Sequence, residues 1–270
     1  MAEKNHAWYD ADFMVPSANL TMHSFFHHDA SILPVEPVSS AVPALHDAEL
    51  AAIYYGERKG GDFYDFLRVS ANRVVFGLLD VAGRSEQNRT IVAAAQKTFR
   101  EKSLELLSSD TVNEADAMTE ICLHLNHTIL DIETDGVRSC PAFVGSYNEN
   151  LGILCYTNAG HTPALVRDGT GIVELPATGL PFGLFSHSTC DAPMAAIPSG
   201  GALLLVSRGV VEGRRHGEEF GLSGVKKTLQ RPTSSAKDLC RALIEDVRQF
   251  MGTPPTHNDV TALSLVRNSS

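Results

Sequence analysis

The chain has 270 residues, of which 43% are hydrophobic and 20% charged, and these are values of a globular protein that can bury its own core. Its formal net charge of −10 argues against non-specific binding to nucleic acid or to an anionic membrane, because both need a basic face. No apolar run approaches the roughly 18 residues of a membrane span, and the first residues lack the pattern of a signal peptide. The five cysteines are widely spaced and form no CxxC pair, which indicates reduced core thiols. We therefore expect a cytoplasmic protein with no nucleic-acid or membrane partner.

The first 45 residues differ in composition from the rest of the chain. They contain Pro34, Pro37 and Pro43 with serines between them, a pattern that favours extended chain over regular structure. Aromatic residues are also frequent there. We expect residues 1–45 to form an extended arm that packs on its own domain or on a partner, and that could form a homodimer.

From residue 46 onward the hydrophobic pattern changes to that of regular elements. Alternating or short apolar runs bounded by turn residues predict strands, and they occupy residues 49–58, 62–70, 73–83, 140–150, 151–161, 162–175, 201–213 and 259–267. Apolar residues at helical spacing predict three helices, over residues 85–109, 112–132 and 235–251. The turn-like segments 148–152 and 168–171 predict hairpins.

This order of elements predicts the fold class. Strands, two helices, more strands, a helix and a last strand form an α+β order, in which packed sheets with flanking helices are expected. We see no internal repeat and no interior linker. The prediction is one domain over residues 46–268 that follows the arm.

Acidic residues stand at the ends of two predicted strands. Asp62 follows two glycines, and Asp80 follows an apolar run that would carry it to the edge of a core. A carboxylate at the end of a buried strand is costly unless it is paired or binds a cation. Asp62 and Asp80 are therefore candidate oxygen ligands of Mg²⁺ or Mn²⁺, and the alternative is that both only cap turns.

Seven short motifs carry a resemblance to a known family. In chain order they are GGDFYDF, LLDVAG, NAGHTPALV, GLPFG, LLLVSRGVVEG, EEFG and NDVTALSL. Their order and spacing resemble the bacterial PPM-type serine phosphatases, in the subgroup of the sporulation stage II protein E phosphatase and the anti-sigma-factor-antagonist phosphatases. The resemblance covers about residue 49 to about residue 267.

The resemblance implies a fold and a chemistry. The family fold is a β-sandwich of two antiparallel sheets flanked by helices, with a two-metal Mn²⁺ or Mg²⁺ site at one edge. Its members hydrolyse phosphoserine or phosphothreonine on proteins through a metal-bound water. Two cations suit this reaction because they lower the pKa of the water and neutralise phosphate charge.

The resemblance also assigns ligand positions. Asp80 matches the aspartate that bridges both metals, and Val81 matches the neighbour that offers a backbone carbonyl. Asp62 matches the acidic residue that acts mainly through metal-bound water. Asp62 and Asp80 are thus the expected catalytic and metal-binding side chains.

Two positions depart from the family pattern, and both fall on the same metal. Arg208 stands in the SRG turn where the family has an aspartate, and Asn258 replaces the first aspartate of the last turn. Asp259 matches the neighbouring position, although a one-residue slip would let it serve as the ligand. A guanidinium in a poorly solvated metal pocket adds repulsion of several kcal/mol. We expect one Mn²⁺ or Mg²⁺ ion at most, or none.

Three positions are open to the Arg208 side chain. It could take the place of the missing cation and pair with Asp80, with Asp62 as a further partner. It could instead point to solvent while one ion remains on Asp62 and Asp80. It could also contact the phosphate of a substrate.

The sequence does not decide whether the protein is an active enzyme, but it favours one interpretation of its function. The favoured interpretation is a phosphatase-like protein with impaired or lost activity that acts on or binds a phosphorylated regulatory protein, for example an anti-sigma-factor antagonist. The alternative is an active Mn²⁺- or Mg²⁺-dependent phosphoserine phosphatase with a one-metal or rearranged site. A third hypothesis is an assembly domain served by its arm, without phosphate chemistry.

Overall fold

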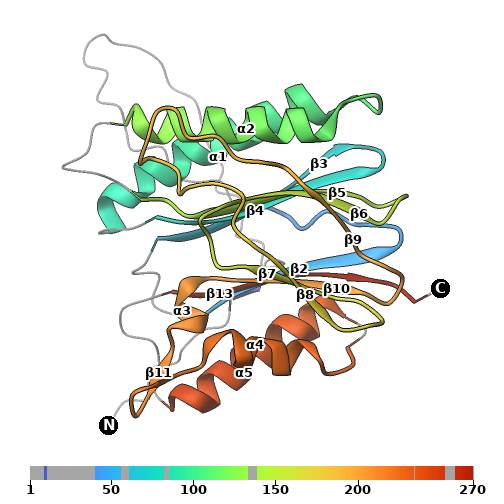
Figure 1. The fold of residues 1–270 in the computed structure, drawn as a ribbon, viewed down its shortest axis with the longest axis vertical. Helices are drawn as coiled ribbons and strands as arrows, with labels where there is room; N and C mark the ends of the chain where they lie inside the picture. Colours follow the sequence, from blue (N-terminus) through green and yellow to red (C-terminus); the bar gives the residue numbers. More distant parts are fainter. Residues whose placement is uncertain are drawn as a thin grey trace, which may run out of the picture.

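The computed structural model is built on two antiparallel β-sheets that face one another (Figure 1). It describes residues 9–10, 40–55, 61–81, 85–132, 139–233, 235–252 and 259–269. One sheet has six strands, in the order β1 (Tyr9–Asp10), β2 (Ala48–Tyr55), β13 (Val260–Arg267), β10 (Ala202–Val206), β7 (Ala164–Arg167) and β8 (Ile172–Leu175). The other has five, in the order β3 (Asp62–Ser70), β4 (Arg73–Asp80), β5 (Ala142–Asn148), β6 (Ile153–Ala159) and β9 (Met194–Ala196).

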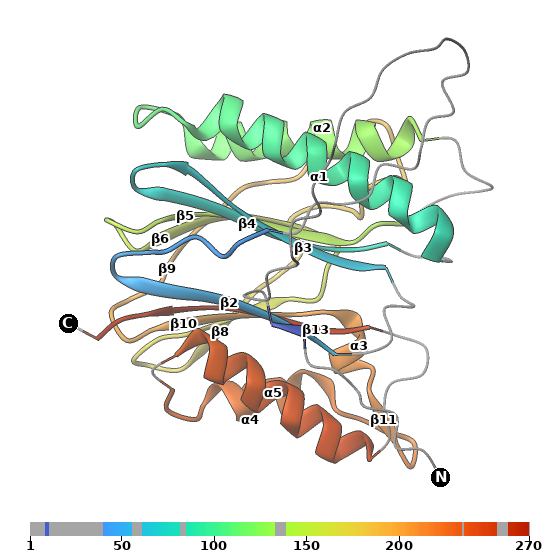
Figure 2. The ribbon, with the colours of Figure 1, turned by 180° about the vertical axis from the view of Figure 1, so that it is seen from behind.

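Helices cover the outer face of each sheet (Figures 1 and 2). The five-stranded sheet carries α1 (Ser85–Leu107) and α2 (Glu114–Leu130), whereas the six-stranded sheet carries α4 (Gly221–Leu229) and α5 (Ala236–Met251). A short helix α3 (Arg208–Val211) follows β10, and a hairpin of β11 (Arg214–Arg215) and β12 (Glu218–Glu219) comes next. In the part of the chain that the structure describes, no helix is long and apolar enough to cross a membrane.

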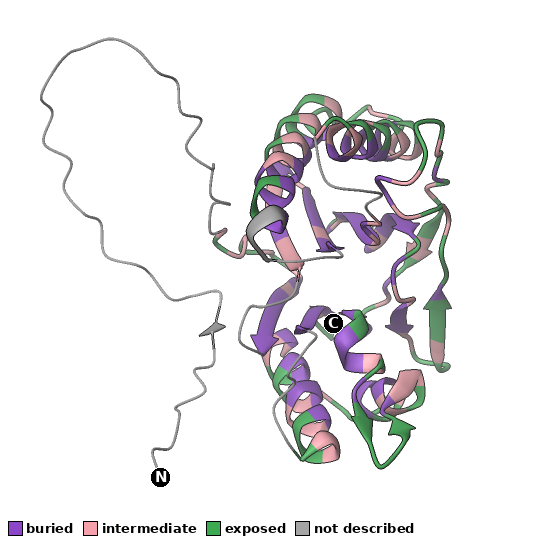
Figure 3. Ribbon diagram, turned by 90° about the vertical axis from the view of Figure 1, so that its left-hand side faces the viewer, coloured by how far each residue is buried: buried purple, intermediate pink, exposed green. Residues whose placement is uncertain are grey.

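The alternation of side chains along each strand explains the layers. In β10, Leu203 and Leu205 pack in the interior between the sheets, whereas Leu204 and Val206 pack against the layer of α4 and α5. The same alternation in β4 and β13 divides the buried residues into three layers (Figure 3). Because each sheet is covered on both sides, its central strands need apolar side chains on both faces.

Polar side chains fix the starts of two helices. Asn113 accepts a hydrogen bond from the Asp116 amide at the start of α2, and Ser235 does the same for Asp238 at the start of α5. Glu49 on β2 also accepts hydrogen bonds from the first amides of α5. These contacts satisfy backbone donors that a helix leaves free at its first turn.

The predicted fold class is confirmed. The structure is the α+β sandwich of two antiparallel sheets with flanking helices, and both predicted hairpins form. The strand predicted over residues 201–213 is wrong in its second half, because β10 ends at Val206 and the helix α3 begins at Arg208. The elements α4, β9, β11 and β12 were not predicted either. Most of the proposed arm lies outside the described residues. The domain boundary between residues 45 and 46 and the homodimer formed through the arm therefore stay predictions.

Candidate metal and phosphate site

Asp62 and Asp80 face one another at one edge of the five-stranded sheet. Asp62 opens β3, Asp80 ends β4, and the two are directly opposed in the antiparallel register. Opposed residues in such a pair project from the same face of the sheet, so both carboxyl groups lie on one side. Next to them the Val81 amide donates to the Gly61 carbonyl at 3.0 Å, which holds the two chain segments together.

Burial makes these two carboxyl groups costly to ionise. Removal from water and, next, the charge of Asp80 raise the pKa of Asp62 to about 8, although a hydrogen bond of 2.7 Å from the Thr261 hydroxyl opposes the shift. The pKa of Asp80 is also raised by burial, against the influence of Arg208. Two neighbouring carboxyl groups with raised pKa values favour the binding of a cation between them.

Arg208 supplies a cation at this edge from the opposite sheet. It begins α3, directly after β10, and its Nε atom lies 3.4 Å from Asp80 Oδ2. Asp62 makes no ion pair with Arg208 in the described part of the chain; it accepts from Thr261 instead. The Arg208 side chain is 49% exposed, so water screens this ion pair and weakens it. Of the three arrangements open to Arg208, the structure has the pair with Asp80.

Asp259 lies close by but has a different partner. It is buried just before β13 and accepts a hydrogen bond from the Tyr54 hydroxyl, and its charge raises the pKa of both Asp62 and Asp80. Its carbonyl accepts from the Ser207 hydroxyl at 3.1 Å. Asn258 lies outside the described residues, so the structure does not test its role or the one-residue slip.

The oxygen atoms at this edge are of the kind that a hard dication binds. Asp62, Asp80 and the Val81 carbonyl offer oxygen atoms, and Mg²⁺ or Mn²⁺ prefers oxygen and keeps several water ligands. The Val81 carbonyl already accepts from Asn88 Nδ2 at 3.1 Å, which leaves its second lone pair. Within the described ranges, no three acidic, histidine or cysteine side chains cluster closely enough to hold a metal. A second ion on Asp80 would meet the guanidinium of Arg208.

His161 lies near Arg208 and belongs to the NAGHTPALV motif, and the sequence alone assigned it no role in the site. It follows Gly160, a residue with φ of +66° that packs against Pro181, and its Nδ1 lies 3.1 Å from the Thr162 carbonyl. Its Nε2 atom is buried and has no hydrogen-bond partner within the protein as described. Burial, together with the nearby charge of Arg208, lowers the pKa of His161 to about 4 despite the bond to Thr162. The imidazole is therefore neutral at pH 7.

The buried imidazole predicts a stability that falls in mild acid. The unfolded chain takes up a proton at His161 near its ordinary pKa of 6.5, whereas the folded chain does so only near 4. Stability from this residue is thus complete above pH 6.5 and is lost as the pH falls toward 4, with a total of about 3 kcal/mol. Asp62, whose pKa is raised, changes the stability in the opposite direction over this pH range, but it does so equally in wild type and in His161→Gln. Urea unfolding at pH 7.5 and pH 5 should therefore show the loss from His161 as a shift in the difference in unfolding free energy between wild type and His161→Gln. Replacing the exposed His187 by glutamine should leave the loss intact.

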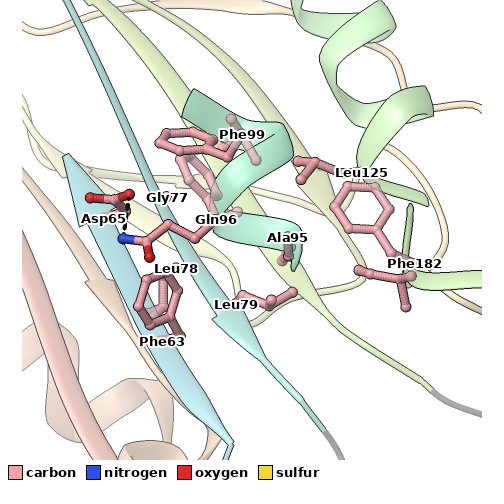
Figure 4. A pocket seen from close by; sticks show the side chains of 14 residues that line it. Phe63, Asp65, Gly77, Leu78, Leu79, Ala95, Gln96, Phe99, Leu125 and Phe182 are labelled. Carbon is pink, nitrogen blue, oxygen red and sulfur yellow. Dashed lines mark hydrogen bonds between the residues drawn. The ribbon is translucent and has the colours of Figure 1, made fainter. Parts of the chain in front are cut away.

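A separate cavity under α1 does not form part of the site. It has a volume of about 40 Å³, and its walls are mostly apolar, with Asp65 and Gln96 at one end (Figure 4). Asp65 binds Gln96 and Arg100 of α1 at 3.0 and 2.7 Å. Because strand side chains alternate, Asp65 faces the layer of α1 and not the face of Asp62, three residues earlier. The cavity has room for a few water molecules and none for a phosphoprotein side chain.

Comparison with solved structures identifies the fold. The RsbU and RsbW domains of Rv1364c from Mycobacterium tuberculosis match with a TM-score of 0.66 and 20% identity, over 87% of this chain and 63% of that one. The PP2C phosphatase domain of SpoIIE from Bacillus subtilis matches with a TM-score of 0.66 and 16% identity, over 83% and 63%. RsbX in complex with magnesium matches with a TM-score of 0.58 and 14% identity, over 84% and 98%. The fold is that of a PPM-type phosphatase domain.

Sequence comparison then identifies the family. The family model of stage II sporulation protein E (SpoIIE) matches residues 70–268, and the chain belongs to this family. It therefore contains a serine/threonine phosphatase domain of the SpoIIE and Rsb type. The phosphoserine phosphatase RsbP of Bacillus subtilis (strain 168) is 26% identical over 181 residues, which are 66% of this chain and 43% of RsbP. The chain thus spans less than half the length of this relative.

Proposed function

We propose that this domain is an attenuated phosphatase that holds at most one Mn²⁺ or Mg²⁺ ion and has impaired or lost hydrolytic activity. The observation that supports this proposal is the contact between Arg208 Nε and Asp80 Oδ2 at 3.4 Å. Asp80 matches the family's bridging ligand, so a guanidinium at this carboxylate competes with a metal for the same oxygen atoms. Asn258, where the family has a further aspartate, adds to this argument from the sequence.

The side chains at this edge of the sheet define what an attenuated site could still do. A bound dication would neutralise phosphate charge and activate water. Asp62 and Asp80 would hold that ion, with the Thr261 hydroxyl fixing the orientation of the Asp62 carboxylate through its 2.7 Å hydrogen bond. Arg208 keeps part of its guanidinium in solvent, where it can contact a phosphate group that approaches the edge of the sheet.

The partner we propose is a phosphorylated regulatory protein, for example an anti-sigma-factor antagonist. The similarity to RsbP, a phosphoserine phosphatase, supports phosphoserine as the chemical group that is recognised. The net charge of −10 supports a protein partner over a nucleic acid. The domain would then act on this partner slowly, or regulate it by binding alone. A homodimer formed through the arm remains part of the proposal.

The second candidate is an active phosphatase with one metal. It is favoured by the retention of Asp62 and Asp80 in direct cross-strand opposition. Because the Arg208 ion pair is half-exposed, a strongly binding ion could displace the guanidinium at a small cost in free energy.

Hydrolysis of p-nitrophenyl phosphate with Mn²⁺ tests the two candidates. An attenuated domain should show little turnover in wild type, and the Arg208→Asp/Asn258→Asp double variant should gain turnover. Asp80→Ala is the control, because it removes the ligand shared by all metal-dependent schemes. Robust wild-type turnover that Asp80→Ala abolishes would exclude the attenuated phosphatase and establish the active one.

A further inference from the structure

Two buried cysteines from distant parts of the chain meet behind the five-stranded sheet. Cys122 lies on α2, and Cys190 lies in the segment that leads into β9. Each thiol lies near enough to shift the pKa of the other, and both residues belong to the core layer between α2 and the sheet. All five cysteines are free in this structure.

Contacts on both sides of Cys122 hold α2 against the segment that carries Cys190. Thr119, three residues earlier on the helix, donates to the Cys190 carbonyl at 3.2 Å. Asn126, four residues later, accepts from the Gly183 amide and donates to the Phe185 carbonyl, both at 2.9 Å. Residues three and four apart share one helix face, so this face places Cys122 at Cys190.

The Cys190 thiol is confined from the other side as well. A Cβ atom on Gly179 would lie 2.4 Å from Cys190 Sγ, so the chain there must pass close to the sulfur. The direct neighbours of Cys190, Thr189 and Asp191, are exposed, and Cys190 itself keeps 4% of its surface exposed. The backbone at Cys190 therefore lies at the surface of the protein, while its side chain belongs to the core.

From this geometry we propose that Cys122 and Cys190 form an oxidisable dithiol site, which a two-electron oxidant such as hydrogen peroxide converts to a disulfide. This inference goes beyond the proposed function and does not depend on the metal site. The thiols are held in contact by the fold, which is the first requirement for a disulfide.

The reaction divides into two balanced steps. The Cys190 sulfur attacks a peroxide oxygen, the O–O bond breaks, and Cys190 becomes a sulfenic acid with release of one water. The Cys122 sulfur then attacks the Cys190 sulfur, the S–O bond breaks, and a second water leaves. Peroxide gains two electrons, and each sulfur loses one. The neighbouring thiol of Cys122 lowers the pKa of Cys190, against the effect of burial, which favours Cys190 as the attacking thiol.

The disulfide would join α2 to a segment that supports the candidate site. Phe182 in that segment exchanges two backbone hydrogen bonds with Cys140, at 2.9 and 3.1 Å. The next residue, Pro141, accepts a hydrogen bond of 2.9 Å from the amide of Asp80. The bond would also close a long loop between residues 122 and 190, which should raise the melting temperature by on the order of 5–10 °C.

The test is to treat the folded wild-type domain with hydrogen peroxide, block the remaining thiols in denaturant, and map the disulfides by mass spectrometry. We expect a linked peptide pair that contains residues 122 and 190, the loss of two of the five free thiols, and a rise in melting temperature that dithiothreitol reverses. Cys190→Ser should lose the linked pair. Cys240→Ser, in the buried layer under α5, should keep it.

Cys155 is the main alternative disulfide partner of Cys122. Its thiol donates to the Ala192 carbonyl at 3.5 Å and lies near enough to influence Cys122 electrostatically. A link from Cys122 to Cys155, or five intact thiols after peroxide treatment of the folded chain, would overturn the proposal. The mapping uses wild-type protein, so it does not depend on whether a variant folds.

Discussion

Replacing Arg208 by aspartate is expected to strengthen Mn²⁺ binding by at least about 10-fold. The change removes the cation that lies 3.4 Å from Asp80 and adds a carboxylate at the same edge of the sheet. Attraction between a dication and one more carboxylate amounts to a few kcal/mol in a partly solvated site, and about 1.4 kcal/mol already gives a factor of ten. Isothermal titration calorimetry with MnCl₂ measures the affinity directly, without reference to catalysis.

The matched control for this experiment is Arg215→Asp. Arg215 is an exposed arginine on β11, with no ion pair in the described part of the chain, and its replacement changes the net charge by the same amount. It should leave the affinity within about twofold, because Arg215 is exposed and forms no ion pair with Asp80, so that water and salt screen its charge. If Arg208→Asp binds Mn²⁺ no better than Arg215→Asp, then Arg208 does not compete with an ion.

The second large effect is expected for Gly61→Ala. A Cβ atom on Gly61 would lie 1.9 Å from the Val81 carbonyl oxygen, and that contact is with backbone, which cannot rotate away. The start of β3 must then separate from the end of β4, which disturbs the opposition of Asp62 and Asp80. We expect a loss of on the order of 3 kcal/mol in the free energy of unfolding, together with weaker Mn²⁺ binding.

Gly169→Ala controls for the general effect of adding a methyl group to a glycine. Gly169 lies in the exposed turn between β7 and β8, and a Cβ atom there would meet nothing within 4 Å beyond its chain neighbours. Urea unfolding should show a change within about 0.5 kcal/mol for this variant. An equally small change for Gly61→Ala would contradict the close approach of the two strand ends.

Short apolar runs bounded by turn residues made most strands of the two sheets predictable from the sequence. In β10, every residue from Ala202 to Val206 is apolar, which is typical of a strand covered on both faces. The same reasoning placed Asp80 at the end of a buried strand. The turn at 148–152 has Asn148 at its start and Gly152 with φ of +66°, so turn chemistry alone indicated that hairpin.

Other features depend on contacts between distant segments and could not be predicted in this way. The helix α3 is a single turn that begins at Arg208 after a strand, and its neighbours give it no periodic pattern. The orphaned Nε2 of His161 depends on packing from several elements, and the contact between Cys122 and Cys190 joins residues far apart in the chain.

The candidate site lies across the seam between the two sheets. Asp62 and Asp80 belong to the five-stranded sheet, whereas Thr261 and Arg208 approach from the six-stranded sheet or the chain that follows it. A cation or phosphate bound here would therefore contact residues of both sheets at the same time. A ligand bound at this site would therefore oppose any movement of one sheet relative to the other. Because such coupling is reciprocal, a change in the relative position of the two sheets would change the affinity of the site for its ligand.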